Sequence, residues 1–187
     1  MKIQMKNQLR IIGGVHKRRQ LAFANIEGLR PTPDRLRETL FNWLMWDIEG
    51  AKVLDLCAGS GALSFEALSR GAKSVHMIEP NLEQVKFLKQ NLALLNIENA
   101  KVYASTAQQA LAKINESFDV LFLDPPYSLN LWEELSQLAN EKLNENTLIY
   151  VEADRPLDSI NLPKTWQKIK DSKVGIIYAG LYRKSEK

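Results

Sequence analysis

Short hydrophobic runs alternate along the chain with longer segments in which apolar side chains recur every three or four residues. The first pattern is typical of buried β-strands and the second of amphipathic helices. The runs predict strands over 52–57, 74–78, 100–104, 118–123 and 147–152, and the segments between them predict helices over 62–70, 81–95, 107–114 and 131–142. Two further β-prone runs, 166–172 and 175–183, can complete the sheet as a hairpin. This order predicts an α/β fold with a Rossmann-like, doubly wound sheet and right-handed crossovers.

The N-terminal residues carry a different pattern. Runs over 8–12 and 19–23 surround a Gly-Gly pair and predict a β-hairpin whose connection, residues 16–19, is basic. A ribbon with cations at its tip can follow a nucleic-acid backbone. We therefore divide the chain into a basic extension over 1–30 and a larger domain over 31–187.

The segment Arg30-Pro31-Thr32-Pro33 ends this extended structure and begins a helix. Thr32 is the predicted N-cap, and Pro33 suits the first helical position. The helix is predicted to reach Asp47, and Trp46 is expected to pack rather than to stack on a base. Its core face is predicted to hold Leu36, Leu40, Trp43 and Leu44.

Composition limits the class of protein. The 187 residues fit one domain with an appendage, and no run approaches the ~18 apolar residues of a membrane span. The N-terminus lacks a signal-peptide core. A single cysteine, Cys57, excludes an internal disulfide and fits a reducing cytoplasm. Cys57, His16 and His76 lack the spacing of metal ligands, so we expect no metal site.

The net charge of +3 conceals an asymmetry. Residues 1–37 hold nine Lys or Arg and two acids, a net charge of +7, which leaves −4 for residues 38–187. A basic arm on a mildly acidic body is expected for a phosphate-rich partner. The alternative is an ordinary solvated tail.

The stretch Val53–Leu63 reads as a buried strand, a turn of small residues and the start of a helix. Gly59 and Gly61 allow a tight turn and a close approach of backbone to ligand. Such a unit binds nucleotide-type cofactors at the carboxyl edge of a parallel sheet. Ser64 stands where a dinucleotide fingerprint has its third small residue, and no Gly-Lys-Ser or Gly-Lys-Thr follows, which excludes a P-loop.

Two acids accompany the glycines. Asp55 lies near the end of the first predicted strand, beside the loop, and Glu79 follows the second, where a carboxylate can accept hydrogen bonds from ribose hydroxyls. This pattern resembles the class I methyltransferases that use S-adenosylmethionine. The cationic sulfonium and ammonium groups of that cofactor give an acid such as Asp55 a role beside the loop. The alternative for Asp55 is a buried carboxylate bonded only to local N–H groups.

The motif Asp124-Pro125-Pro126-Tyr127 follows the fourth predicted strand, at the same sheet edge. An exocyclic amine on a nucleobase is a poor nucleophile because its lone pair is delocalised into the ring. Asp124 and the carbonyl of Pro125 can accept its hydrogens, and Tyr127 can stack on the base. Methyl transfer then depends largely on proximity and orientation. A plain Pro-Pro loop is the alternative.

Five stretches together resemble one specific family, the RsmD family of bacterial 16S ribosomal RNA guanine-N2 methyltransferases, named for guanine 966. They are residues 10–14, 30–44, 54–63, 66–72 and 124–127, so the likeness spans nearly the whole chain. The resemblance implies a seven-stranded methyltransferase sheet whose last strand is antiparallel, with an N-terminal β-hairpin extension. It also implies action on the small ribosomal subunit or an assembly intermediate, by a cytoplasmic enzyme that we expect to be a monomer.

The resemblance assigns residues as well. Catalysis would involve Asp124, Pro125 and Tyr127. S-adenosylmethionine would be held by Asp55, Ala58, Gly59, Ser60, Gly61, Glu79, Pro80, Thr106 and Ala107. RNA would contact Arg10, His16, Lys17, Arg18, Arg19, Arg30 and Arg35. One departure concerns Thr106, because relatives usually carry Asn or Asp there, before an Ala; a hydroxyl cannot mimic a carboxylate, and the backbone N–H of Ala107 is the safer adenine contact.

Two other functions share parts of this pattern. An adenine-N6 methyltransferase acting on DNA or RNA carries a similar Asp/Asn-Pro-Pro-Tyr motif, although the Arg-Pro-Thr helix and the lack of a separate target-recognition domain favour RNA guanine. A non-catalytic RNA-binding assembly factor is the other, and the intact acids and glycines oppose it.

Overall fold

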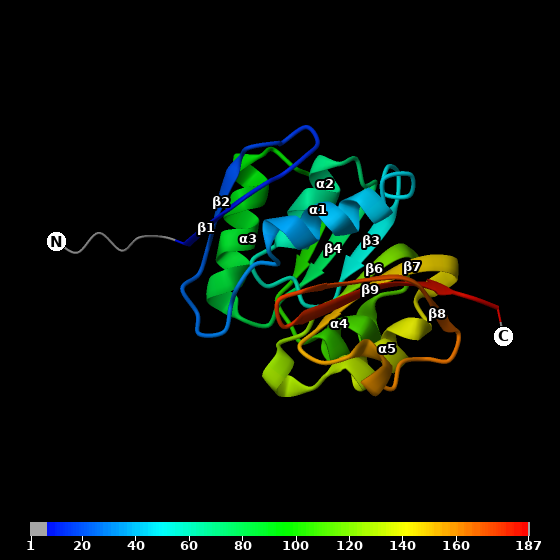
Figure 1. Cartoon of the computed structure of the whole chain (residues 1–187). Coiled ribbons are helices and arrows are strands. Elements are labelled where there is room, and N and C mark those ends of the chain that lie inside the picture. Colours follow the sequence, from blue (N-terminus) through cyan, green and yellow to red (C-terminus); the bar gives the residue numbers. More distant parts are fainter. Residues whose placement is uncertain (1–6, 187) are drawn as a thin grey trace.

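The computed structural model describes residues 7–186 and contains one large sheet flanked by helices, plus a two-stranded hairpin (Figure 1). The sheet strands are β3 Lys52–Asp55, β4 Ser74–Ile78, β5 Ala100–Tyr103, β6 Phe118–Leu123, β7 Leu143–Ala153, β8 Trp166–Val174 and β9 Ile177–Lys184. The helices are α1 Asp34–Trp43, α2 Ala62–Ser69, α3 Leu82–Leu94, α4 Ala107–Lys113 and α5 Trp132–Asn140, with short 3-10 turns at Tyr127–Leu129 and Leu157–Ser159. The hairpin pairs β1 Asn7–Arg10 with β2 Gln20–Phe23.

The seven strands lie in the order β5-β4-β3-β6-β7-β9-β8. All neighbours pair in parallel except at β9, which is antiparallel to both β7 and β8. Helices α1, α2 and α3 cover one face and α4 and α5 the other, so the buried apolar residues form two clusters (Figure 1). The predicted α/β fold with an antiparallel last strand is confirmed.

Helix α1 departs from its predicted boundaries. It begins at Asp34 after Pro33, no side chain caps it, and it ends at Trp43 rather than Asp47. The predicted N-cap at Thr32 is therefore wrong, because the Thr32 hydroxyl donates to Glu152 Oε2 across the core at 3.2 Å instead. The predicted packing of Trp46 is also wrong: the residue lies in the turns after the helix and is 88% exposed.

The region around β7 also differs from prediction. Strand β7 begins at Leu143 instead of residue 147, and the preceding helix α5 is shorter at both ends than predicted. The added strand residues pair across a bulge, since Phe118 lies opposite Leu143 while Val120 lies opposite Leu148. Residues Asn144–Asn146 are polar, so a prediction based on apolar runs did not include them in the strand.

The β1–β2 hairpin is fastened to the helices beside it. The Gln84 side chain of α3 accepts from Ala24 N at 2.8 Å, and Asn91 Nδ2 donates to the carbonyl of Ala22 at 2.9 Å. On α2 the buried Glu66 carboxylate accepts from the backbone N–H groups of Ile12 and Gly13. The hairpin is thus positioned by specific polar contacts with α2 and α3.

Within residues 7–186, no helix combines the length and the apolar character that crossing a membrane requires.

Candidate active site

Four carboxyl groups gather at the carboxyl edge of the sheet. Asp55 is the last residue of β3, Glu79 follows β4, Asp124 follows β6, and Glu152 is near the end of β7. Because β3 through β7 run in parallel, these positions meet at one edge. The chain connects β3 to β4 on one side and reaches β6 on the other, so Asp55 and Asp124 flank the switch point at which such sheets bind ligands.

The loop after β3 depends on two glycines. Gly59 has φ +54° and Gly61 has φ +85°, conformations that favour glycine. A Cβ on Gly61 would lie 2.7 Å from the Phe65 ring and 2.8 Å from Leu88. The N–H of Gly61 donates to the carbonyl of Ala58 at 2.8 Å, which closes the turn. The predicted cofactor residues 58–61 thus form one compact loop that leads directly into α2.

One carboxylate oxygen of Asp55 has no hydrogen-bond partner among the described residues. The side chain is 1% exposed, and its Oδ2 accepts from the Ser64 hydroxyl at 2.7 Å. Its Oδ1 is buried and has no hydrogen-bond partner within the described chain. Desolvation by burial raises the pKa of Asp55 to about 6, against the lowering effects of the Ser64 hydroxyl and of the Cys57 backbone N–H. A buried acceptor without a partner beside a glycine loop suits a ligand that carries donors or positive charge.

The second predicted acid has a similar environment. Burial raises the pKa of Glu79 to about 7, the backbone of Asn81 lowers it, and the charge of Asp55 raises it further. Pro80 follows on the surface. Burial and the charges of Asp55, Asp124 and Glu79 raise the pKa of the Cys57 thiol well above its usual range. The edge is therefore electronegative and partly dehydrated, which favours a cationic ligand.

Thr106 and Ala107 lie at the next strand end along the sheet, after β5. Thr106 is the N-cap of α4: its hydroxyl accepts from Gln109 N at 3.2 Å, and Gln109 Oε1 accepts from Thr106 N at 3.3 Å. This capping box occupies one of the two lone pairs of the Thr106 hydroxyl and fixes its orientation at the start of α4. Ala107 is buried in the first turn of that helix.

The predicted catalytic motif stands at the end of β6. Asp124 and Pro125 follow the strand directly, and Tyr127 opens a 3-10 turn. The Tyr127 ring lies 6.1 Å from that of Trp132 at an interplanar angle of 25°. Burial and the charges of Glu152, Asp124 and Asp154 raise the pKa of the Tyr127 phenol well above its usual range. The motif thus combines acceptor groups with a neutral aromatic ring.

Sequence reasoning missed two residues of this site. Glu152 is 2% exposed and lies beside Asp124, because β6 and β7 pair Leu123 with Val151. Trp132 is 1% exposed and its Nε1 donates to the carbonyl of Glu152 at 2.9 Å. The signal for Glu152 was present: it is an acid close to the end of a predicted strand, as Asp55 is.

Comparison with known proteins identifies the relationship. The family model described as Conserved hypothetical protein 95 matches residues 9–183. Ribosomal RNA small subunit methyltransferase D of Haemophilus influenzae is 43% identical over 184 residues, 95% of either chain. The structure of a putative methyltransferase, YhhF, from Escherichia coli aligns with a TM-score of 0.86 at 40% identity, covering 97% of this chain and 100% of that one.

The chain belongs to this family. The resemblance to RsmD enzymes, which the sequence motifs indicated, is thereby confirmed. A putative SAM-dependent methyltransferase from Streptococcus mutans shares the fold alone, at 12% identity and a TM-score of 0.76, with 98% of this chain and 56% of that chain covered. The predicted methyltransferase type of sheet is confirmed at the level of fold.

The predicted RNA-binding residues of this family member fall into two groups. Arg30 and Arg35 are exposed near the start of α1, and Arg10 is exposed beside Asp34, with Arg10 Nη2 3.2 Å from Asp34 Oδ2. The remaining four lie in the connection between β1 and β2. They are His16, Lys17, Arg18 and Arg19, of which the last three are exposed and His16 is partly buried.

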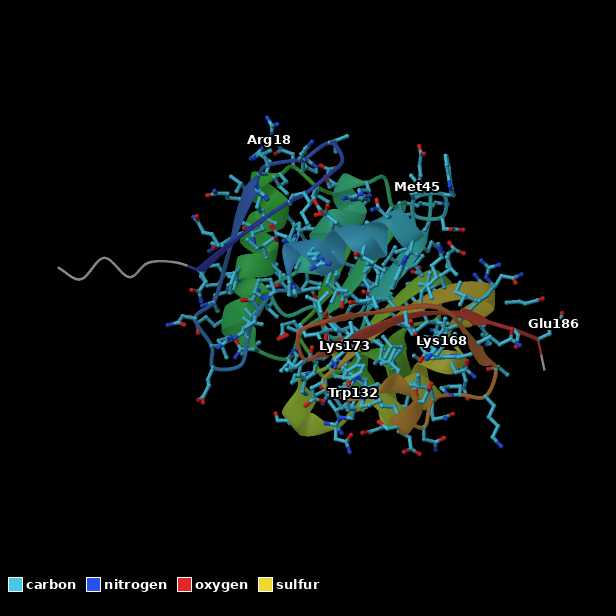
Figure 2. All side chains as sticks on the ribbon, viewed as in Figure 1. Arg18, Met45, Trp132, Lys168, Lys173 and Glu186 are labelled. Carbon is cyan, nitrogen blue, oxygen red and sulfur yellow. The ribbon has the colours of Figure 1, made fainter. Side chains whose placement is uncertain are left out.

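That connection is fixed at the far end of α2. His16 N donates to Ser69 Oγ at 3.0 Å, and Val15 N donates to the carbonyl of Ser69 at 2.8 Å. Helix α2 begins at the glycine loop and ends at Ser69. Its length therefore separates the glycine loop from the connection over residues 16–19 by about 12 Å. Figure 2 places Arg18 and Trp132 far apart, near opposite sides of the molecule. The structure therefore does not bring residues 16–19 to the carboxyl edge.

One of the basic residues at the start of α1 is structural. Arg37 is 1% exposed; its Nη1 lies 3.7 Å from Glu66 Oε2 and donates to the carbonyl of Arg10 at 2.9 Å, and its Nη2 pairs with Asp34. This buried cation joins β1, α1 and α2. It therefore contributes nothing to the exposed basic surface.

Proposed function

We propose that the chain methylates the exocyclic N2 of a guanine, of the guanine 966 type, in 16S ribosomal RNA, with S-adenosylmethionine as methyl donor. The observation that carries the proposal is the position of Asp124-Pro125-Pro126-Tyr127 at the end of β6, beside the Gly59–Gly61 loop. The similarity to ribosomal RNA small subunit methyltransferase D supports ribosomal RNA as the substrate class.

The residues around the loop fit that cofactor. Asp55 Oδ1 is an acceptor without a partner within residues 7–186, and Glu79 stands where ribose hydroxyls can donate. Residues 58–61 let the backbone approach closely, Pro80 borders Glu79, and Ala107 offers its backbone N–H to the adenine. When bound, S-adenosylmethionine supplies an electrophilic methyl group next to Asp124.

Asp124 and Pro125 prepare the amine. Each can accept one N2 hydrogen, which shifts electron density toward nitrogen and points its lone pair along the methyl–sulfur bond. Tyr127 stacks on the base and fixes its plane. Formation of the bond between N2 and the methyl carbon, with cleavage of the carbon–sulfur bond, would give S-adenosylhomocysteine and N2-methylguanine, and the proton lost from N2 would pass to bulk water. Asp124 serves as an acceptor throughout and does not need to be a full general base.

The basic groups suit a large RNA particle. Arg10, Arg30 and Arg35 lie near α1, whereas residues 16–19 project from the far end of α2, so a substrate that meets both must extend across the molecule. We propose the small subunit or an assembly intermediate as that substrate. The enzyme would act as a cytoplasmic monomer whose residues 1–30 are an RNA-binding extension to a catalytic domain over 31–187.

A labelled-methyl assay tests the function. The chain is incubated with methyl-labelled S-adenosylmethionine and unmodified small subunits, and the labelled nucleotide is then identified by digestion and chromatography. N2-methylguanosine in 16S RNA is the expected product. N6-methyladenosine would favour the adenine alternative, and binding to subunits without label would favour a non-catalytic assembly factor.

A further inference from the structure

Glu152 is a buried acid that the proposed transfer does not use. It lies beside Asp124 on the neighbouring strand and on the same side of the sheet, because directly paired residues of parallel strands point the same way. The rings of Phe122 and Tyr150, two residues earlier on the same strands, meet edge to face at 6.4 Å and show this alignment. The two carboxyl groups are therefore neighbours at the place where the target base is expected.

Several groups position the Glu152 carboxyl. The Thr32 hydroxyl donates to Oε2 at 3.2 Å, and the Tyr150 hydroxyl donates to Oε1 at 3.3 Å. The Asp124 carboxyl is also hydrogen-bonded to it. Burial, followed by the charge of Glu152, raises the pKa of Asp124 well above its usual range, and a hydrogen bond from Thr32 opposes this rise. The Thr32 and Tyr150 hydroxyls occupy two of the about four lone-pair sites of a carboxylate, so the Glu152 carboxyl can accept further hydrogen bonds.

The edge of guanine complements this arrangement. Guanine presents N1–H directly beside its N2 amine, two adjacent donors in one plane. Adenine presents an acceptor, N1, beside its N6 amine, and would turn a lone pair toward a buried carboxylate. Such a mismatch leaves a charged group without its hydrogen bond, which a buried site tolerates poorly.

We propose that Glu152 is a specificity-determining residue that accepts the N1–H of the target guanine while Asp124 and Pro125 hold its N2 amine. The inference rests on the proposed function and deepens it, since it gives a reason why the same Asp-Pro-Pro-Tyr motif acts here on guanine and not on adenine. Thr32, at the start of α1, then contributes by orienting Glu152.

The test compares guanine with 2-aminopurine at the methylated position of reconstituted small subunits. The analogue keeps the 2-amino group but has an acceptor at N1. We expect the wild-type protein to prefer guanine by about 10- to 100-fold in kcat/KM. Glu152→Gln offers an amide that can donate to the analogue, so the preference should fall at least about tenfold. A ratio measured on one preparation is insensitive to the fraction of folded protein.

Two further variants serve as a control and as an independent test of the role of Glu152. Glu133→Gln makes the same chemical change on the exposed face of α5 and should leave the preference unchanged. Thr32→Val removes one donor to Glu152 without changing its charge, should lower the preference severalfold, and provides the measurement if Glu152→Gln does not fold.

The outcomes separate the two proposals. Wild-type protein that methylates both bases equally, or an unchanged preference in Glu152→Gln, would overturn the role of Glu152 and leave N2 methylation standing. An absence of N2-methylguanosine with unmodified subunits would overturn the proposed function first, and the role of Glu152 with it.

Discussion

Two charged regions of this molecule differ in how their charge is held. The carboxyl edge of the sheet gathers Asp55, Glu79, Asp124 and Glu152 in partly or fully buried positions, each fixed by a strand end. The connection over residues 16–19 holds its cations largely in solvent, anchored through its backbone to Ser69. Burial in the first region fixes the side chains and raises the pKa values of Asp55, Glu79 and Asp124, whereas the exposed side chains of the second region can adopt several conformations.

The two regions are suited to different kinds of ligand. Buried acids interact strongly with a small ligand, because low dielectric and fixed orientation enlarge each contact. Exposed cations contribute through many weak, salt-screened contacts with phosphate. Mutations at the edge should therefore act on catalysis and cofactor affinity in large steps, and mutations in the connection should act on subunit binding in small, salt-dependent ones.

The largest effect is expected from Asp124→Ala. It removes the side-chain acceptor for the N2 amine, so turnover on unmodified subunits should fall by about 10²- to 10³-fold or more. Affinity for S-adenosylhomocysteine, measured by calorimetry, should stay close to that of the wild type. Asp158→Ala, at an exposed acid on the short turn after β7, is the control and should keep full activity. Near-normal turnover in Asp124→Ala would mean that the motif has another role.

Asp55→Ala should come next in size. Loss of the buried carboxylate should weaken S-adenosylhomocysteine binding by about 10- to 100-fold, as expected for a hydrogen bond to a charged group. Ser64→Ala removes only the hydroxyl that donates to Oδ2, so its effect should be severalfold at most. Calorimetry on both variants measures this; equal affinities in Asp55→Ala and wild type would show that Oδ1 faces no part of the cofactor.

The sequence predicted the edge well because strand ends are local features. Asp55, Glu79 and Asp124 each follow a hydrophobic run, and parallel topology then brings them together without any further information. Glu152 was missed although it is the last residue of the predicted strand over 147–152, because no glycine loop or Pro-Pro motif follows it to mark a site. Its importance appears only when Asp124 and Thr32 are seen beside it.

The position of the connection could not be predicted from the pattern. A basic loop between two β-prone runs indicates nucleic acid, but nothing local shows which end of the molecule it occupies. Its place is set by long-range contacts: Glu66 and Ser69 accept hydrogen bonds from backbone groups more than fifty residues away in sequence. The predicted N-cap at Thr32 was wrong for a similar reason, because the Thr32 hydroxyl donates to the distant Glu152 side chain instead.

The connection itself is tested by replacing Lys17, Arg18 and Arg19 with Ala. If each contacts one phosphate, the slope of log affinity against log salt should become shallower by about two to three, and subunit binding at low salt should weaken by about tenfold. A control that removes three exposed cations elsewhere, Lys89, Lys113 and Lys164, should leave the slope unchanged. A wild-type slope in the first variant would place the RNA contact on other residues.

The smallest effect concerns pH and the cofactor acids. The pKa of Asp55 is raised to about 6 and that of Glu79 to about 7, so in the free protein their ionised forms are lost as pH falls through these values. Both pKa values are higher in the folded protein than in the unfolded chain. The two groups therefore contribute most to the free energy of unfolding of the free protein at low pH, and this contribution is lost as pH rises through 6 to 7. A ligand that requires the ionised forms should reverse the trend. Affinity for S-adenosylhomocysteine should therefore fall about fivefold between pH 8 and pH 6.5, mostly through Glu79.

Glu79→Gln isolates that contribution. The variant retains only the Asp55 titration, so its affinity should change less than about twofold over the same interval, while its affinity at pH 8 is already reduced. Thermal unfolding with and without S-adenosylhomocysteine gives the complementary measurement, and the ligand-induced rise in the midpoint should be larger at pH 8 than at pH 6.5. A rise that grows toward low pH would show that the ligand binds with these acids protonated. The edge would then recognise its cofactor by neutral hydrogen bonds, and the contrast with the basic connection would be one of burial alone and not of charge.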